Sequence, residues 1–186
     1  MDRTQVSWSG GRAAAAIRQA RPNDLAALGD FFAGLSMSTR YLRFFAPVTP
    51  GPTMLRLLAG AAANVDAVVA VRGGVIIGHA MGVDRVDPGG ARVTDVGVVV
   101  ADAWQGRGIG AALTRALLTG AWARGVTAVA MDVLGANQRA LDMIRAHWPA
   151  AGGDRGTDGI TFRIGLGQGQ RPRTGFAAHS ARAAEG

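Results

Sequence analysis

Apolar and polar residues recur with a helical spacing in the N-terminal third of the chain. After a proline, the stretch at 21–35 has an amphipathic pattern that predicts a helix from about Asp24, with Asn23 as its N-cap. Apolar positions near 53–63 predict a second helix, and the small, apolar run at 14–20 predicts a short first strand.

From residue 65 the spacing becomes that of strands. Two runs rich in valine and isoleucine occupy 65–86 and meet at Gly73 and Gly74, a glycine pair that favours a tight hairpin. The turn at 88–90 leads into a further strand, which has the sequence "ARVTDVGVVV" and ends at Val100.

The last third mixes helices and strands. A helix is predicted to end near Gly125, a strand follows at 126–134, and another helix begins after Asn137 and stops before Pro149. Residues 152–166 predict a final hairpin. This order of elements predicts an α+β or α/β fold.

Length and composition predict one domain with two flanking segments. At 186 residues, nearly half of them apolar, the chain is long enough to bury a single core, which we expect at 13–166. Residues 1–12 are predicted to be a flexible leader, and 167–186, rich in glycine, arginine and alanine, a disordered tail. No apolar run is long enough to span a membrane and no secretory signal is found, so a cytoplasmic protein is expected.

The charged residues limit the chemistry that is possible. All twenty basic residues are arginine, and the single glutamate is Glu185, so no lysine can form a Schiff base and no glutamate within the fold can act as a general base. The formal net charge is +7, but the arginines are scattered rather than clustered, which argues against nucleic-acid binding. We expect no metal, because cysteine is absent and the histidines, His79, His147 and His179, lack the spacing of metal ligands.

A glycine-rich loop is the clearest chemical signal. The segment "DAWQGRGIGAAL", Asp102 to Leu113, sets three alternating glycines between a strand and a predicted helix, where backbone N–H groups would suit a pyrophosphate. It lacks the lysine of a Walker-type loop. It satisfies G-x-G-x-x-G/A, and Asp132 ends the next strand as a ribose-binding acid would. Because five residues separate the strand from the first glycine, a dinucleotide-dependent oxidoreductase is the weaker alternative.

Three segments, taken together, resemble the GNAT acyltransferases. The acetyl-CoA loop of that family reads Q/R-x-x-G-x-G/A after a valine-rich strand, and the chain is similar to it in "VVVADAWQGRGIGAAL", with Gln105, Gly108 and Gly110 at the defining positions. The strand and asparagine-led helix that follow this loop in the family resemble "MDVLGANQRALDMI". A third segment, "LSMSTRYLRFF", resembles LS-x-x-S-x-Y-x-R-F in bacterial domains related to protein lysine acetyltransferases.

The resemblance implies a fold and a cofactor. It implies a GNAT-like mixed central sheet, flanked by helices, in which two parallel strands splay apart and the first of them, at 93–100, pairs with the pantetheine arm of acetyl-CoA. The residues implied for acetyl-CoA binding are Val98, Val99, Val100, Gln105, Gly106, Arg107, Gly108, Ile109, Gly110, Ala111 and Asn137. An ordinary helix N-cap is an equally good interpretation of Asn137.

Acyl transfer to an amine needs a group that accepts a proton. Many relatives use a glutamate on the strand before the loop, and Asp95 matches that position. An aspartate is one methylene shorter and is expected to work through a water. The alternative interpretation of Asp95 is a strand-edge or salt-bridged acid. Asp132 is the second candidate for the base and His79 the third, and the alternative interpretation of His79 is a structural histidine on a strand.

The leaving thiolate poses a further question. Relatives often protonate it with a tyrosine, but no tyrosine follows Tyr41, so either water protonates the sulfur or catalysis is slow or absent. Tyr41 is expected to pack with Phe44 and Phe45, with contact to the acceptor as the alternative. The resemblance thus predicts an acetyl-CoA-dependent N-acetyltransferase acting on a protein lysine or a small-molecule amine. A catalytically weak acyl-CoA-binding sensor is the alternative, and a homodimer is left open.

Overall fold

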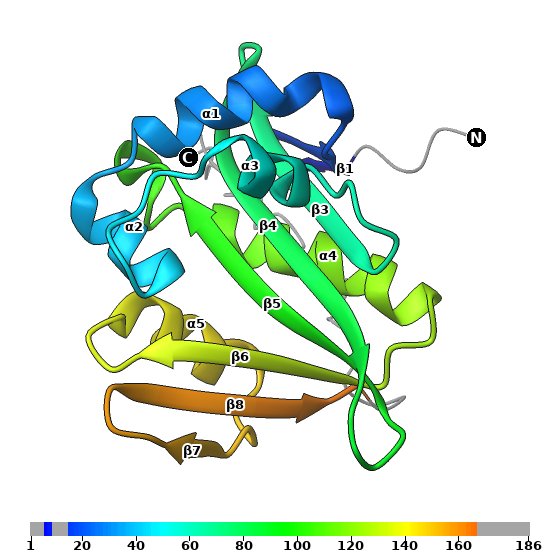
Figure 1. Ribbon diagram of the computed structural model, residues 1–186. Coiled ribbons are helices and arrows are strands. Elements are labelled where there is room, and N and C mark those ends of the chain that lie inside the picture. The colour runs from blue at the N-terminus through cyan, green and yellow to red at the C-terminus, as the bar shows by residue number, and fades with distance from the viewer. Residues whose placement is uncertain (1–5, 9–14, 167–186) are drawn as a thin grey trace, which may run out of the picture.

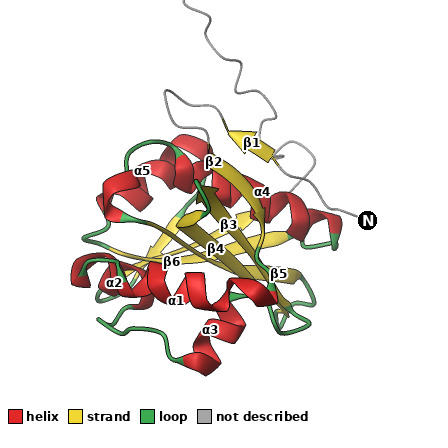
Figure 2. Cartoon of the chain, turned by 90° about the horizontal axis from the view of Figure 1, so that it is seen from above, coloured by secondary structure: helices red, strands yellow, loops and turns green. Residues whose placement is uncertain are grey.

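The computed structural model describes residues 6–8 and 15–166. Its strands are β1 (Val6–Trp8), β2 (Ala15–Gln19), β3 (Val65–Arg72), β4 (Val75–Val86), β5 (Arg92–Val100), β6 (Ala128–Leu134), β7 (Gly153–Arg155) and β8 (Gly159–Gly165). Its helices are α1 (Leu25–Ala33), α2 (Met37–Phe44), α3 (Pro52–Leu58), α4 (Ile109–Ala123) and α5 (Gln138–His147), with short 3-10 helices η1 (Pro22–Asp24) and η2 (Asp102–Trp104). The strands form one mixed sheet in the order β1-β2-β3-β4-β5-β6-β8-β7. One face of the sheet is covered by α1, α2 and α3, and the other by α4 and α5 (Figures 1 and 2).

The sheet changes character between β5 and β6. From β1 to β5 neighbouring strands are antiparallel, and β4 pairs with β5 as far as Val100. In contrast, β5 and β6 are parallel and pair only where 93–95 meet 128–130. Farther along, β6 pairs only with β8, and β5 and β6 diverge from each other toward the left of Figure 1. This mixed sheet has the splayed parallel strands that the resemblance implies.

Most predicted elements are confirmed, and the differences lie at element ends. The hairpin turns at Gly73 and Gly74, whose φ angles of +55° and +81° suit a primed two-residue turn. The first helix is capped by Asp24 rather than Asn23, because the turn of η1 precedes it. The helix predicted near 53–63 ends at Leu58, since the chain reverses at Gly60 with a φ of +78°.

Two segments differ more from expectation. Val6–Trp8, within the predicted leader, pairs antiparallel with β2, because the edge of a sheet offers unpaired backbone groups to any nearby segment. The rest of 1–12 and the predicted tail at 167–186 lie outside the described residues. The apolar pattern also did not predict α2, which begins where the Ser36 hydroxyl accepts the backbone N–H of Thr39 at 3.1 Å.

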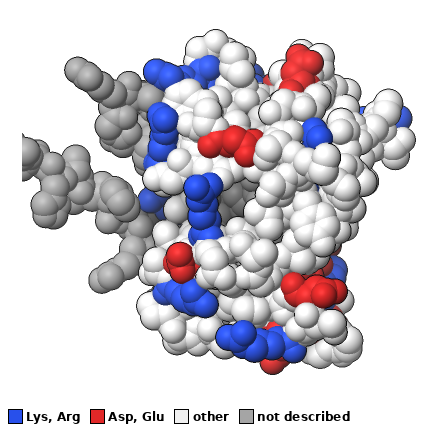
Figure 3. All heavy atoms as spheres, turned by 90° about the vertical axis from the view of Figure 1, so that its left-hand side faces the viewer, with Lys and Arg blue, Asp and Glu red and all other residues white. Residues whose placement is uncertain are grey.

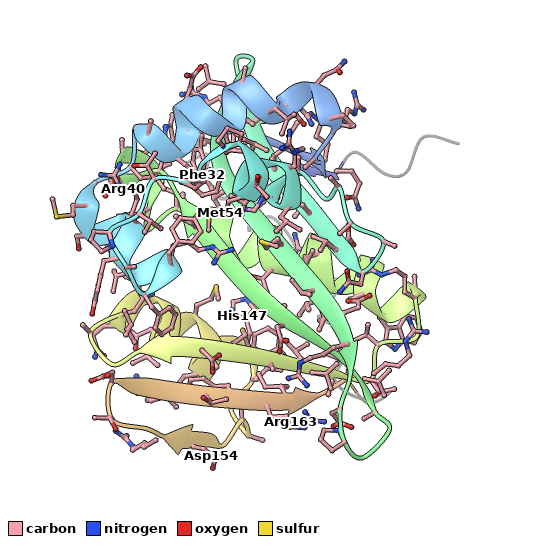
Figure 4. All side chains as sticks on the ribbon, viewed as in Figure 1. Phe32, Arg40, Met54, His147, Asp154 and Arg163 are labelled. Carbon is pink, nitrogen blue, oxygen red and sulfur yellow. The ribbon has the colours of Figure 1, made fainter. Side chains whose placement is uncertain are left out.

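The core occupies both faces of the sheet. Phe32 of α1 points toward the sheet on one face (Figure 4), while Leu113 and Leu117 of α4 fill the other, and all three are fully buried. Within residues 15–166 no helix is both long and apolar enough to cross a membrane. The layers hold β5 and the N-terminus of α4 side by side, which sets the geometry of the candidate site.

Candidate active site

Alternate residues of β5 direct their backbone N–H and C=O groups toward the side on which β5 and β6 diverge, called here the diverging side. The Ala101 N–H donates to the Ile77 carbonyl of β4 at 2.9 Å, and the Arg92 carbonyl accepts from Thr127, just before β6, at 2.8 Å. Because the two sides alternate along a strand, odd-numbered residues of β5 direct their backbone groups to β4 and even-numbered residues direct theirs to β6. The even-numbered residues beyond the stretch paired with β6 are Val96, Val98 and Val100.

Val98 and Val100 therefore present backbone groups as expected, whereas Val99 does not. Val99 is 6% exposed in the core beneath α1 and α3, and its backbone groups point to β4. The Val100 carbonyl already accepts the Gln105 side-chain amide at 3.1 Å. On the diverging side, Val96 and Val98 are left without a strand partner, so an extended polar chain can pair with them.

The glycine loop leads directly into α4. Gly106 and Gly108 have φ angles of +73° and +79°, which glycine adopts without strain, and Gly108 is the N-cap of the helix. The N–H groups of the first helical turn have no intrahelical acceptor. Ala112 is the first residue to bond back into the helix, to the Gly108 carbonyl at 3.1 Å. The loop thus has the free donors and the dipole that an anion requires.

Arginines from three elements surround this loop. The guanidinium carbons of Arg72 and Arg107 lie 4.7 and 4.8 Å from the centre of the Trp104 ring. From α5, Arg139 donates to the side-chain oxygen of Gln105. Basic side chains, with acidic ones among them, are exposed on the side of the molecule where β5 and β6 diverge (Figure 3). The sequence singled out only Arg107, because the other two come from distant parts of the chain.

A polar network ties α2 to the loop. The Asp102 carboxylate accepts from the Ser36 N–H at 3.0 Å, from the Ser36 hydroxyl at 2.7 Å and from the Thr39 hydroxyl at 2.7 Å. Gln105 donates to the same Thr39 oxygen at 3.2 Å. Burial acts to raise the pKa of Asp102, and these hydrogen bonds outweigh it and hold the pKa below its usual value. Two motifs that are far apart in the sequence are therefore bonded to each other.

Asp95 lies beside the divergence, on the face of the sheet that α2 covers. Its two carboxylate oxygens accept from Arg85 of β4, at 2.6 Å from Nε and 3.0 Å from Nη2. Both side chains are more than two-fifths exposed. An exposed ion pair contributes only about 0–1 kcal/mol to stability, so this one opens at little cost. The sequence held no signal for Arg85, which reaches Asp95 only through the pairing of β4 with β5.

Asp132 lines a pocket of about 280 Å³ with Phe45, just after α2, and Thr161 of β8. One of its oxygens accepts the Thr161 hydroxyl at 2.7 Å. Asp95 is paired with Ala130, and residues two apart on a strand share a face, so Asp95 and Asp132 project from the same face of the sheet. The fold thus brings both candidate acids to one side of the divergence.

His79 does not belong to this site. Its ring is completely buried, its Nε2–H donates to the Leu58 carbonyl at the end of α3 at 2.8 Å, and the Phe32 ring lies 5.4 Å away. Burial lowers the pKa of His79 to about 3, and the charge of Arg43 acts in the same direction. An enclosed, neutral imidazole supports the core, and the structure excludes it as the base.

Local geometry answers two further questions. The Asn137 side chain accepts a backbone N–H of the first turn of α5 at 3.2 Å, so its role as an N-cap is confirmed, while cofactor contact stays a prediction.

Tyr41 is 47% exposed and Phe45 is 45% exposed, so the expected core packing is wrong for both. Only Phe44 packs inward, with its ring 5.6 Å from that of Phe32. Tyr41 has the exposure that acceptor contact would need.

Comparison with known sequences agrees with this geometry. The model of the acetyltransferase (GNAT) family matches residues 37–148, which include α2, the splayed strands, the glycine loop and α5. No curated protein sequence matches the chain significantly.

Solved structures share the fold at low sequence identity. The GNAT domain of S. lividans PAT aligns with a TM-score of 0.75 and 22% identity, over 87% of this chain and 97% of that one. For yncA of Salmonella typhimurium, solved with acetyl-CoA, the TM-score is 0.62 and the identity 19%, over 82% and 92% of the two chains. A cAMP-binding acyltransferase from Mycobacterium smegmatis gives 0.61 and 22%, over 91% of this chain but 49% of its own length.

Proposed function

Because the chain belongs to the acetyltransferase (GNAT) family, we propose that it transfers the acetyl group of acetyl-CoA to an amine. One observation carries this proposal: the glycine loop at the start of α4 follows the unpaired edge of β5 after only the short turn of η2. The loop suits a pyrophosphate, and the edge suits an extended chain that carries amide groups. Acetyl-CoA has both parts, joined in that order.

The cofactor contacts that we propose are mostly with the backbone. The N–H groups between Gly106 and Ala111 would bind the pyrophosphate, with the Arg107 cation beside it. Val96 and Val98 would pair with the amides of the pantetheine arm. Gln105 would brace the loop through its bonds to α2 and to β5 instead of binding the cofactor itself.

We propose that the acceptor is a protein lysine. Three exposed apolar side chains lie together in one segment: Met37 and Tyr41 four residues apart on α2, and Phe45 just after its end, where it also lines the Asp132 pocket. Exposed apolar groups beside a pocket offer a docking surface to a folded partner, which a small amine would not need. Two carboxylates, Asp95 and Asp132, on that face of the sheet would attract the ammonium group. A small-molecule amine is the alternative acceptor.

Asp95 is the base that we propose. It lies on β5 next to Val96, whose backbone groups have no strand partner. Its ion pair with Arg85 is exposed, so breaking that pair costs little free energy. Since the aspartate side chain is short, a water would carry the proton from the amine to the carboxylate. Asp132 would hold the incoming ammonium group from the other side of the divergence.

The test incubates the purified protein with acetyl-CoA and a panel of lysine peptides, proteins and small amines, and follows free thiol together with the mass of each acceptor. We expect thiol release and one acceptor class that gains an acetyl group. Asp95→Asn should lower kcat by about 100-fold, the usual effect of losing a general base, with acetyl-CoA affinity unchanged by calorimetry. Arg85→Met is the matched control, and it should keep kcat within about threefold because it frees the proposed base.

A second function is favoured by a separate observation. The carboxylate of Asp95 is fully engaged by Arg85, and the chain has no tyrosine after Tyr41, as in a protein that binds acyl-CoA without rapid turnover. Tight acetyl-CoA binding, with no thiol release on any acceptor and no effect of Asp95→Asn, would favour a sensor of acyl-CoA.

A further inference from the structure

Arg43 of α2 is a partly buried cation without an acid partner in the part of the chain that the structure describes. Its Nε has no exposed surface and no hydrogen-bond partner, and it takes part in none of the ion pairs among residues 15–166. Its guanidinium carbon lies 5.0 Å from the centre of the Phe44 ring. Partial burial lowers the pKa of Arg43 to about 10, so the side chain remains a cation at neutral pH. An unpaired cation in such surroundings costs stability, and its position is therefore informative.

The guanidinium lies against Gly97, in the middle of β5. A methyl group on Gly97 would lie 2.5 Å from Nη2 and 2.7 Å from Nη1 of Arg43, so the space that a side chain would fill is taken by the cation. Gly97 stands between Val96 and Val98, whose backbone groups face the divergence, and it shares a face of the sheet with Asp95. Arg43 therefore lies between two proposed binding regions. One is the backbone of Val96 and Val98, proposed for the pantetheine arm, and the other is the face of the sheet with Asp95, proposed for the acceptor.

Acyl transfer creates negative charge at such a point. When an amine attacks a thioester, negative charge develops on the carbonyl oxygen and then on the departing sulfur. A fixed positive group in a partly buried site stabilises developing charge better than one in water. On the basis of the proposed acetyl transfer, we infer that Arg43 is a catalytic residue that stabilises this charge and compensates for the absence of a tyrosine acid.

The step balances without any additional reactant. The bound ammonium group first gives one proton through water to Asp95, which leaves the nitrogen with a free lone pair. The nitrogen gives this lone pair to the carbonyl carbon, a C–N bond forms, and the π electrons of the C=O bond move onto the oxygen. That electron pair then returns to re-form the C=O bond, the C–S bond breaks, and its electron pair leaves with the sulfur as a thiolate. The nitrogen loses its second proton to solvent, and solvent protonates the thiolate. Arg43 stays protonated throughout and acts only through its charge.

The test compares Arg43→Met with Arg56→Met, which removes a charge from an exposed position of α3. We expect Arg43→Met to lower kcat by about 100-fold, as the loss of one transition-state donor typically does, while the Kd for acetyl-CoA stays within about twofold. Arg56→Met should keep the kcat of the wild type. Arg43→Lys should recover part of the lost kcat, because it restores the charge without the planar geometry.

A second variant approaches the same contact from the strand. Gly97→Ala places a methyl group where the guanidinium of Arg43 lies, and so displaces the guanidinium while the chain keeps its charge. This variant should also lower kcat. If Arg43→Met does not fold, Gly97→Ala provides the test. An unchanged kcat in a folded variant of either kind would overturn the inference. So would a rise in the KM for the acceptor alone, which would make Arg43 a binding residue. If the wild type itself releases no thiol with any amine, the proposed function fails, and the inference fails with it.

Discussion

At the scale of single residues, His79 shows how burial controls protonation. Its pKa falls from an ordinary value of 6.5 to about 3, so from pH 6.5 downward the unfolded chain binds a proton that the folded chain refuses. The stability contributed by the neutral ring is complete above about pH 6.5 and is lost as the pH falls toward 3, by at most about 1.4 kcal/mol per pH unit. His79→Gln, which keeps a donor for the Leu58 carbonyl, should lose this dependence.

The measurement is urea unfolding of both proteins at pH 7 and pH 4.5. Between these values, the wild type should lose about 2–3 kcal/mol more than the variant. Other groups that titrate in this range are common to both proteins, so their contributions cancel in the difference. Equal losses in the two proteins would mean that the ring of His79 takes up its proton while the chain is folded.

At the scale of elements, the start of α4 depends on backbone that only glycine adopts easily. Gly108 has a φ of +79°, so Gly108→Ala should strain the loop by about 1–2 kcal/mol and weaken acetyl-CoA binding by about tenfold, measured by calorimetry. Gly73→Ala is the matched control, since Gly73 also has a positive φ, +55°, with open space around it in the hairpin turn. It should lower the melting temperature similarly and leave the affinity unchanged. Equal affinities in both variants would remove the loop from the cofactor site.

At the scale of the whole molecule, Arg124 joins α4 to the sheet. It lies 2.5 Å from an oxygen of Asp66 on β3 and 2.9 Å from an oxygen of Asp84 on β4, and these carboxylates are 11% and 12% exposed. Arg124→Met would leave two nearly buried acids without their cation, which should cost about 2–3 kcal/mol in chemical unfolding. Arg145→Met, which breaks an exposed pair within α5, should cost no more than about 0.5 kcal/mol. Similar losses in the two variants would show that Arg124 is as dispensable as a surface pair.

Local patterns were enough for much of this molecule. The hairpin at Gly73, the strand that ends at Val100 and the capped helix after Asn137 were all predictable, because each depends on a turn, a period or a cap within a few residues. The prediction failed for α2 because that helix exposes Met37 and Tyr41 instead of burying them, so these residues do not mark an inner face.

By itself, the sequence determined the order of helices and strands and the glycine loop, since hydrophobic period and turn residues are properties of neighbouring residues. The GNAT-like fold and the two aspartates came from the resemblance of its motifs to a known family. Only the tertiary structure decided the contacts between distant residues. These are the hydrogen bond of Arg85 to Asp95, that of Ser36 to Asp102, and the close approach of Arg43 to Gly97. These contacts join separate elements, and their partners are chosen by strand register and by the packing of helices on the sheet. No local pattern encodes that choice, because burial and long-range electrostatics depend on the whole folded chain.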